Sequence, residues 1–118
     1  MQLEERPVGD IVIVGVKGDI TLNKGSDVVL RDKVRSLIQQ GHLKLLIDLS
    51  QVSYMDSAGL GELVQAYATT RNKGGSLKLV GLTKRLVDLL AITKLATVFE
   101  SFDREADAIA SFSAAARP

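Results

Sequence analysis

The stretch LKLLIDLSQVSYMDSAGLGELVQAYA, residues 43–68, carries the strongest indication of the fold. Its first seven residues, 43–49, are mostly apolar, which is typical of a strand in the core of an α/β sheet. A polar loop is expected over residues 50–56. Apolar residues then recur at helical spacing, at positions 60, 63, 64, 67 and 68, and Lys73-Gly74-Gly75 supplies a helix end. A strand, a loop and an amphipathic helix in this order predict one repeating unit of an α/β fold.

The residues upstream of this stretch predict two more strands and another helix. Residues 11–16, IVIVGV, form a β-branched run that is typical of a strand buried on both faces. Residues 3–6 are expected to pair with it as an antiparallel hairpin, with the turn formed by Pro7, Val8, Gly9 and Asp10. Helical spacing begins at Ser26 and ends before Gly41, which stands at a C-cap position. A right-handed crossover should carry this helix into a parallel strand at residues 43–49.

The residues downstream predict one further core strand and two helices. The strand is expected at residues 77–80, and Thr83 is expected to cap a short helix through Leu86, Leu89 and Leu90. Residues 98–99 fit a brief edge strand. Asp103 is expected to cap a final helix, with a frayed tail from about residue 114. Residues 1–118 are therefore predicted to form a single α/β domain, with a mixed, mostly parallel sheet of about four to five strands and about four helices.

The composition excludes several classes of function. The 15 Lys and Arg residues nearly balance the 14 Asp and Glu residues, so the net charge of +1 lacks the excess that direct nucleic-acid binding requires. The absence of Cys and the presence of a single His argue against a metal site, a disulfide or a redox cofactor. The acidic N-terminus and the lack of an apolar run of about 20 residues predict no membrane insertion. We therefore expect a cytoplasmic protein without a cofactor.

The segment from Tyr54 to Gly61 contains two glycines in the first turns of a predicted helix, which suggests a site of close approach. It fits no catalytic or nucleotide-binding motif. A dinucleotide fingerprint would need a third glycine where Val64 stands, and a nucleophile elbow would need glycine at Met55. The chain contains no Gly-Lys-Ser or Gly-Lys-Thr of a P-loop. The only base for Ser57 would be His42, which precedes a strand and should lie at the opposite end of the sheet. No catalytic residue is predicted, and the protein is not expected to be an enzyme.

Ser57 has two compatible interpretations. Its hydroxyl fits the N-cap of the helix, where it would accept a backbone N–H. The same position suits a phosphorylated serine, because a phosphate at a helix N-terminus is stabilised by the helix dipole and free N–H groups. Two further features have open interpretations. Lys84 and Arg85 fit either a solvated helix face or a rim contact to an acidic partner. A stripe of aliphatic residues fits either the core or, where part of it is exposed, a docking site for a partner helix; it consists of Leu86, Leu89, Leu90, Ile92 and Leu95.

Residues 47–61, IDLSQVSYMDSAGLG, together with the strand end at Gly18 and the segment LKLVG at 77–81, resemble the bacterial STAS-domain anti-sigma-factor antagonists. The resemblance spans nearly the whole chain, and residues 56–61, DSAGLG, match the most specific part of the family motif. It implies that Ser57 is phosphorylated by a partner that is both serine kinase and anti-sigma factor, and is dephosphorylated by a metal-dependent serine phosphatase. The unphosphorylated form would sequester the partner and free a sigma factor.

The resemblance also implies which residues contact the partner. These are Asp56, Ser57, Ala58, Gly59, Leu60, Gly61, Thr21 and Asn23, in a protein that is a monomer or a weak dimer. One position departs from the family pattern: Thr21 stands where members often have aspartate, which leaves the choice of partner open. The alternative function is that of a STAS regulatory subunit of a membrane transporter, without a phosphorylation switch.

Overall fold

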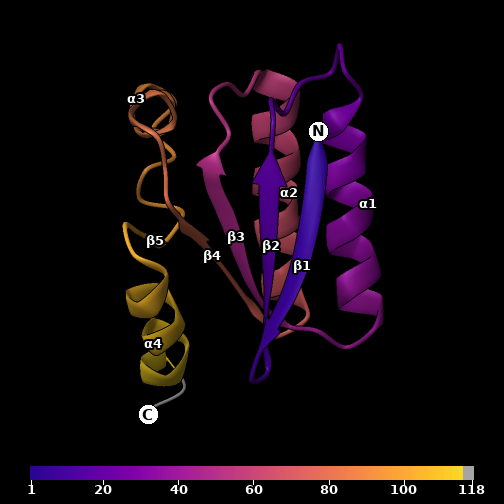
Figure 1. Cartoon of the computed structure of the whole chain (residues 1–118), viewed down its shortest axis with the longest axis vertical. Helices are drawn as coiled ribbons and strands as arrows, with labels where there is room; N and C mark the ends of the chain where they lie inside the picture. Colours follow the sequence, from indigo (N-terminus) through magenta and orange to yellow (C-terminus); the bar gives the residue numbers. More distant parts are fainter. Residues whose placement is uncertain (116–118) are drawn as a thin grey trace.

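The sheet follows the order of the chain. The computed structural model describes residues 1–115, and its five strands are β1 (Gln2–Val8), β2 (Ile11–Lys17), β3 (Lys44–Gln51), β4 (Ser76–Val80) and β5 (Ser101–Phe102). They lie side by side in the order β1-β2-β3-β4-β5 (Figure 1). β1 is antiparallel to β2, and all other neighbours are parallel. The predicted mixed, mostly parallel sheet is therefore confirmed.

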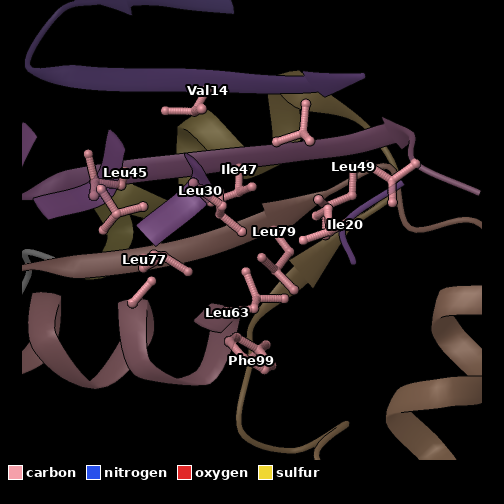
Figure 2. Close-up of a cluster of buried hydrophobic side chains, with 14 of the residues drawn as sticks. Val14, Ile20, Leu30, Leu45, Ile47, Leu49, Leu63, Leu77, Leu79 and Phe99 are labelled. Atoms are coloured by element: carbon pink, nitrogen blue, oxygen red, sulfur yellow. The ribbon is translucent and has the colours of Figure 1, made fainter. Parts of the chain in front are cut away.

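Three of the four helices share one face of the sheet with the larger core. The helices are α1 (Ser26–Gln39), α2 (Ser57–Asn72), α3 (Lys84–Ile92) and α4 (Glu105–Ala115). Alternate strand residues such as Val14, Ile47 and Leu79 pack in one cluster with buried residues of α1, α2 and α3. Figure 2 shows this cluster, in which Leu63 of α2 and Phe99 lie close to the strand residues. The alternation along each strand sets which side chains enter this core.

The opposite face of the sheet carries a smaller core under α4. Ile13, Leu46 and Val80 pack there against Ala108 and Phe112. Lys78 of β4 is also buried on this side, with 1% of its surface exposed. Its Nζ donates to the carbonyl oxygen of Ser111 at 3.1 Å and to Oγ of Ser111 at 3.0 Å, and it lies 4.8 Å from the ring centroid of Phe112. The buried charge is thus compensated by these contacts to α4, by the ring of Phe102 at 6.0 Å and by Glu100 at 3.4 Å.

The N-terminal hairpin is confirmed, with a tighter turn than predicted. Pro7 and Val8 belong to β1, where they pair with Val12 and Ile11, so only Gly9 and Asp10 form the turn. Pro7 fits this strand because β1 is at the edge of the sheet and no further strand needs its missing N–H. Likewise, β3 continues through Gln51, so the loop that was expected to start at Ser50 is shorter.

Three predictions for the C-terminal third are wrong. The edge strand is Ser101–Phe102 rather than residues 98–99, since Phe99 instead enters the core and packs edge-on against Tyr67 at 5.4 Å between ring centroids. The last helix begins at Glu105, so Asp103 is not the residue that precedes it. Ile92 is 79% exposed and does not join the core with Leu86 and Leu90. The frayed tail expected from residue 114 lies mostly outside the described residues, and α4 itself continues to Ala115.

Candidate functional site

The N-terminus of α2 is positioned by contacts between two loops. The loop after β2 and the loop after β3 come together in a short parallel bridge between Ile20 and Met55, which are both buried. The Ile20 N–H donates to the carbonyl oxygen of Tyr54 at 3.1 Å, and the Asp56 N–H donates to the carbonyl oxygen of Ile20 at 3.2 Å. The start of α2 is therefore held at the carboxyl end of the parallel strands, where α/β proteins commonly place their sites.

Asp56, and not Ser57, caps α2. The Asp56 backbone is extended, and its Oδ1 accepts the N–H of Gly59 at 2.9 Å. Its Oδ2 accepts the N–H of Leu22 at 2.9 Å. These hydrogen bonds, that from Gly59 first, hold the pKa of the Asp56 carboxyl below its usual 3.8. The predicted N-cap role of Ser57 is corrected, because a carboxylate one residue earlier already accepts the helix N–H.

Ser57 is the first residue of α2, and its side chain is exposed. Ala58 beside it is half-buried and adds no bulk beyond a methyl group. A hydroxyl in this position is open to a modifying enzyme, and the positive end of the helix dipole favours an added phosphate. The geometry is thus compatible with the second interpretation of Ser57, that of a modifiable hydroxyl.

The two glycines of the motif have different roles. Gly59 is buried, and a Cβ atom there would lie 2.3 Å from the carbonyl oxygen of Ile20 and 2.9 Å from Cγ of Met55. Only glycine lets α2 approach the loop after β2 this closely. Gly61 is exposed, and a Cβ atom on it would meet nothing within 4 Å. Packing within the chain therefore accounts for Gly59 and not for Gly61.

The remaining residues of the expected partner surface divide into buried and exposed ones. Leu60 belongs to the core, and Thr21 is 8% exposed. Oγ1 of Thr21 accepts the N–H of Lys24 at 3.3 Å, so Thr21 shapes the loop from within. Asn23 is exposed in the same loop. Of the eight residues expected to contact a partner, Ser57, Asn23 and Gly61 are thus exposed, and Asp56 and Ala58 are half-buried.

Asp19 links the two loops at their base. Its Oδ1 accepts the hydroxyl of Ser53 at 3.0 Å, and its Oδ2 lies 3.5 Å from Nζ of Lys24. Sequence reasoning did not find this link, nor the contact between Asp56 and Leu22. It also missed two exposed apolar side chains beside the site, Leu22 at 66% and Tyr54 at 46%. The one available signal for the first of them was the place of a leucine in a short loop, between Thr21 and Asn23.

The geometry separates Ser57 from His42, the one base that the sequence offered for it. His42 precedes β3 and Ser57 follows its other end, and the eight residues of β3 alone span about 26 Å. Within residues 1–115, no group of three or more His, Cys, Asp or Glu side chains is arranged to hold a metal ion. Over the same part of the chain, none of the helices combines the length and apolar character needed to cross a membrane.

These features define a class of protein: an α/β domain with an exposed serine at the first position of a helix, followed by the small residues Ala58 and Gly59. The model of the STAS domain matches residues 2–108. The chain is 42% identical to the anti-sigma-B factor antagonist of Bacillus subtilis over 87 residues, which are 74% of this chain and 77% of that protein. The chain therefore belongs to the STAS-domain family, within the group of the anti-sigma factor antagonists.

Solved structures share the fold. An anti-sigma factor antagonist from Mycobacterium paratuberculosis superposes with a TM-score of 0.83 at 20% identity, covering 95% of this chain and 93% of that one. The anti-sigma factor antagonist SpoIIAA superposes in its unphosphorylated form with a TM-score of 0.70 at 16% identity, covering 93% of this chain and 96% of that one. The phosphorylated form of SpoIIAA, from Bacillus, superposes with a TM-score of 0.72 at 18% identity, covering 93% of this chain and 98% of that one. At these identities the likeness concerns the fold.

Proposed function

We propose that this protein is an anti-sigma factor antagonist whose binding is switched by phosphorylation of Ser57. In its unphosphorylated form it binds an anti-sigma factor that is also a serine kinase, and so releases a sigma factor. A metal-dependent serine phosphatase restores the binding form. The protein acts in the cytoplasm as a monomer or weak dimer, and it has no catalytic turnover of its own.

The single observation that carries this proposal is the exposed hydroxyl of Ser57 at the first position of α2, beside a cap that does not need it. Asp56 already satisfies the N–H of Gly59, so phosphorylation of Ser57 need not remove a bond that holds the helix. The fold is compatible with such a modification, because SpoIIAA adopts it in a phosphorylated form. The relatives named as anti-sigma factor antagonists support the choice of partner.

The switch works by charge. A phosphoserine adds up to about two negative charges at pH 7. If a partner carboxylate lies about 8 Å from the phosphate, the repulsion at an effective dielectric constant near 20 is about 4 kcal/mol, or about a thousandfold in affinity. Burial of the phosphate in the interface would add a desolvation cost of the same sign.

The experiment is a calorimetric titration of a purified anti-sigma factor kinase from the source organism against four forms of the protein. The wild type and Ser57→Ala are expected to bind with similar Kd values, and the phosphorylated form is expected to bind about a thousandfold more weakly. Ser57→Asp should fall between them, because it carries one charge and lacks the phosphate's three oxygens. Equal affinities for the phosphorylated and unphosphorylated forms would overturn the switch. If no kinase of the organism transfers phosphate to Ser57, the function as a transporter subunit becomes the better account.

A further inference from the structure

The exposed apolar side chains are concentrated at the end of the molecule that carries Ser57. Within the described residues, seven large hydrophobic side chains are exposed, and six of them belong to this end. They lie in the loops after β2 and β3, in the first turns of α1 and α3, and at the start of β1, which pairs with the end of β2 (Figure 1). These six are Met1, Leu22, Val28, Val29, Tyr54 and Val87. Ile92, at the far end of α3, is the seventh. A one-sided distribution of this kind marks an interaction surface more often than scattered exposed residues do.

Leu22 and Tyr54 are the two members that are fixed directly beside the phosphorylatable serine. The N–H of Leu22 donates to Oδ2 of Asp56, and the carbonyl oxygen of Tyr54 accepts the N–H of Ile20. Their backbones are therefore held by the same contacts that place Ser57. Side chains on a backbone that is already ordered lose less conformational entropy on binding, so they can act as anchors in a partner's pocket.

The charged residues around these anchors favour an acidic partner. Lys17 at the end of β2 and Lys84 and Arg85 at the start of α3 are exposed, and none of them forms an ion pair within the described part of the chain. The carboxylates of the two loops, by contrast, are engaged: Asp56 accepts two N–H groups, and Asp19 contacts Ser53 and Lys24. Asp88 is the exposed carboxylate on the outer part of α3. Within the described residues, the three cations Lys17, Lys84 and Arg85 are therefore charges at this end that are free to pair with carboxylates of a partner.

We propose that Leu22 and Tyr54 are the apolar anchors for the partner that reads Ser57, and that Lys84 and Arg85 steer an acidic rim of that partner onto this end. The occupant is thus a protein surface with an apolar pocket bordered by carboxylates. This inference rests on the proposed function and adds the chemistry of the partner to it. Such carboxylates would also be the groups that reject phosphoserine.

The first test compares matched truncations of exposed apolar residues. Leu22→Ala and Tyr54→Ala are each expected to weaken binding of the anti-sigma factor that binds the wild type by about tenfold or more. Ile92→Ala, which removes a more exposed side chain at the opposite end of α3, is expected to change Kd less than twofold. All three variants should keep the thermal midpoint of the wild type, because the side chains are exposed. Wild-type affinity in both Leu22→Ala and Tyr54→Ala would overturn the assignment of the anchors.

The second test concerns the rim. Replacing both cations in the double variant Lys84→Glu/Arg85→Glu should lower the association rate constant for the anti-sigma factor and remove most of the salt dependence of that rate. The control Lys73→Glu, at the other end of α2, should change neither the rate nor its salt dependence. An unchanged association rate would overturn the acidic partner.

The two proposals fail separately. If Leu22→Ala and Tyr54→Ala weaken binding but phosphorylation of Ser57 does not, the assignment of the anchors stands and the phosphorylation switch is contradicted. A wild-type dimer that Leu22→Ala dissociates would show that a second copy occupies the surface, which contradicts the proposal. A wild type that binds no anti-sigma factor of its organism would contradict both.

Discussion

At the scale of single residues, Asp56 has more contacts to lose than Ser57. Its two carboxylate oxygens join the first turn of α2 to the loop after β2, whereas Ser57 next to it is exposed. We therefore predict that Asp56→Ala lowers the thermal midpoint by several degrees, and that Ser57→Ala leaves it almost unchanged. Asp56→Asn should lower the thermal midpoint less than Asp56→Ala does, since asparagine is also a good N-cap. Thermal unfolding of the three variants followed by circular dichroism checks this order, and a larger loss in Ser57→Ala would contradict the assignment of the cap.

The same residue predicts part of the acid sensitivity of the protein. Hydrogen bonds from Gly59 and Leu22 lower the pKa of Asp56 below 3.8 in the folded state. A carboxyl whose pKa is lower in the folded state stabilises the fold above its unfolded pKa, and that contribution is lost as the pH falls through the folded pKa. Between pH 5 and about pH 2, the stability of Asp56→Asn should therefore fall less steeply than that of the wild type. Denaturant unfolding at a series of pH values measures the two slopes, and parallel slopes would argue against this role.

The position of this cap could not be read from the sequence. Asp and Ser are both favoured N-caps, and they stand next to each other at positions 56 and 57. The apolar spacing that indicates the helix starts only at Leu60, so it fixes the helix start to within about a turn. The contact of Asp56 with Leu22 joins residues 34 positions apart, and only the folded chain brings them together. The serine itself was identifiable because motif and helix start coincide there.

At the scale of the element, replacing the two glycines of α2 by alanine should change the stability of the protein in opposite directions. Gly59→Ala would force a Cβ atom against the carbonyl oxygen of Ile20, and we expect it to lose about 2 kcal/mol or more of stability. Gly61→Ala meets open space and should gain about 0.5–1 kcal/mol through its helix propensity. Chemical denaturation of both variants measures this difference.

Gly61→Ala is also expected to bind the anti-sigma factor less tightly than the wild type, because its methyl group would stand on the surface beside Ser57. A variant that is both more stable and bound as well as the wild type would show that the partner does not approach α2 at this turn. The stability measurement serves as the control, since a loss of binding in a stabilised protein cannot arise from unfolding.

Sequence patterns predicted the longer elements and misplaced the shortest strand. β3 and α2 have extended apolar patterns, so their type was identifiable and their ends moved by only one or two residues. β5 has two residues, and its place depends on pairing with β4 through residues such as Leu79. The apolar pair at 98–99 gave the stronger strand signal, but Phe99 is taken by the core instead. Such a choice depends on tertiary packing, which local propensity does not contain.

At the scale of the whole molecule, the second face of the sheet depends on α4. Phe112 is 3% exposed and covers both Lys78 and the apolar residues of β2, β3 and β4. Phe112→Ala is expected to cost about 3–5 kcal/mol, because it removes a buried ring and exposes the lysine that the ring covers. Ala110→Ser, on the exposed side of the same helix, should cost less than about 0.5 kcal/mol. Urea unfolding measures both, and equal small losses would mean that α4 contributes little to the fold.

The strand order described above also bears on how quickly the chain folds. Because each strand lies beside the one that follows it in the sequence, no strand has to be inserted between two that have already paired. Each crossover contains a helix, and each parallel pair joins residues 22 to 34 positions apart rather than the two ends of the chain. Refolding followed by stopped-flow fluorescence of the two tyrosines should accordingly be a single phase. Since α4 follows all the strands in the chain, a growing chain can pair its first four strands before the helix that covers their second face has been synthesised.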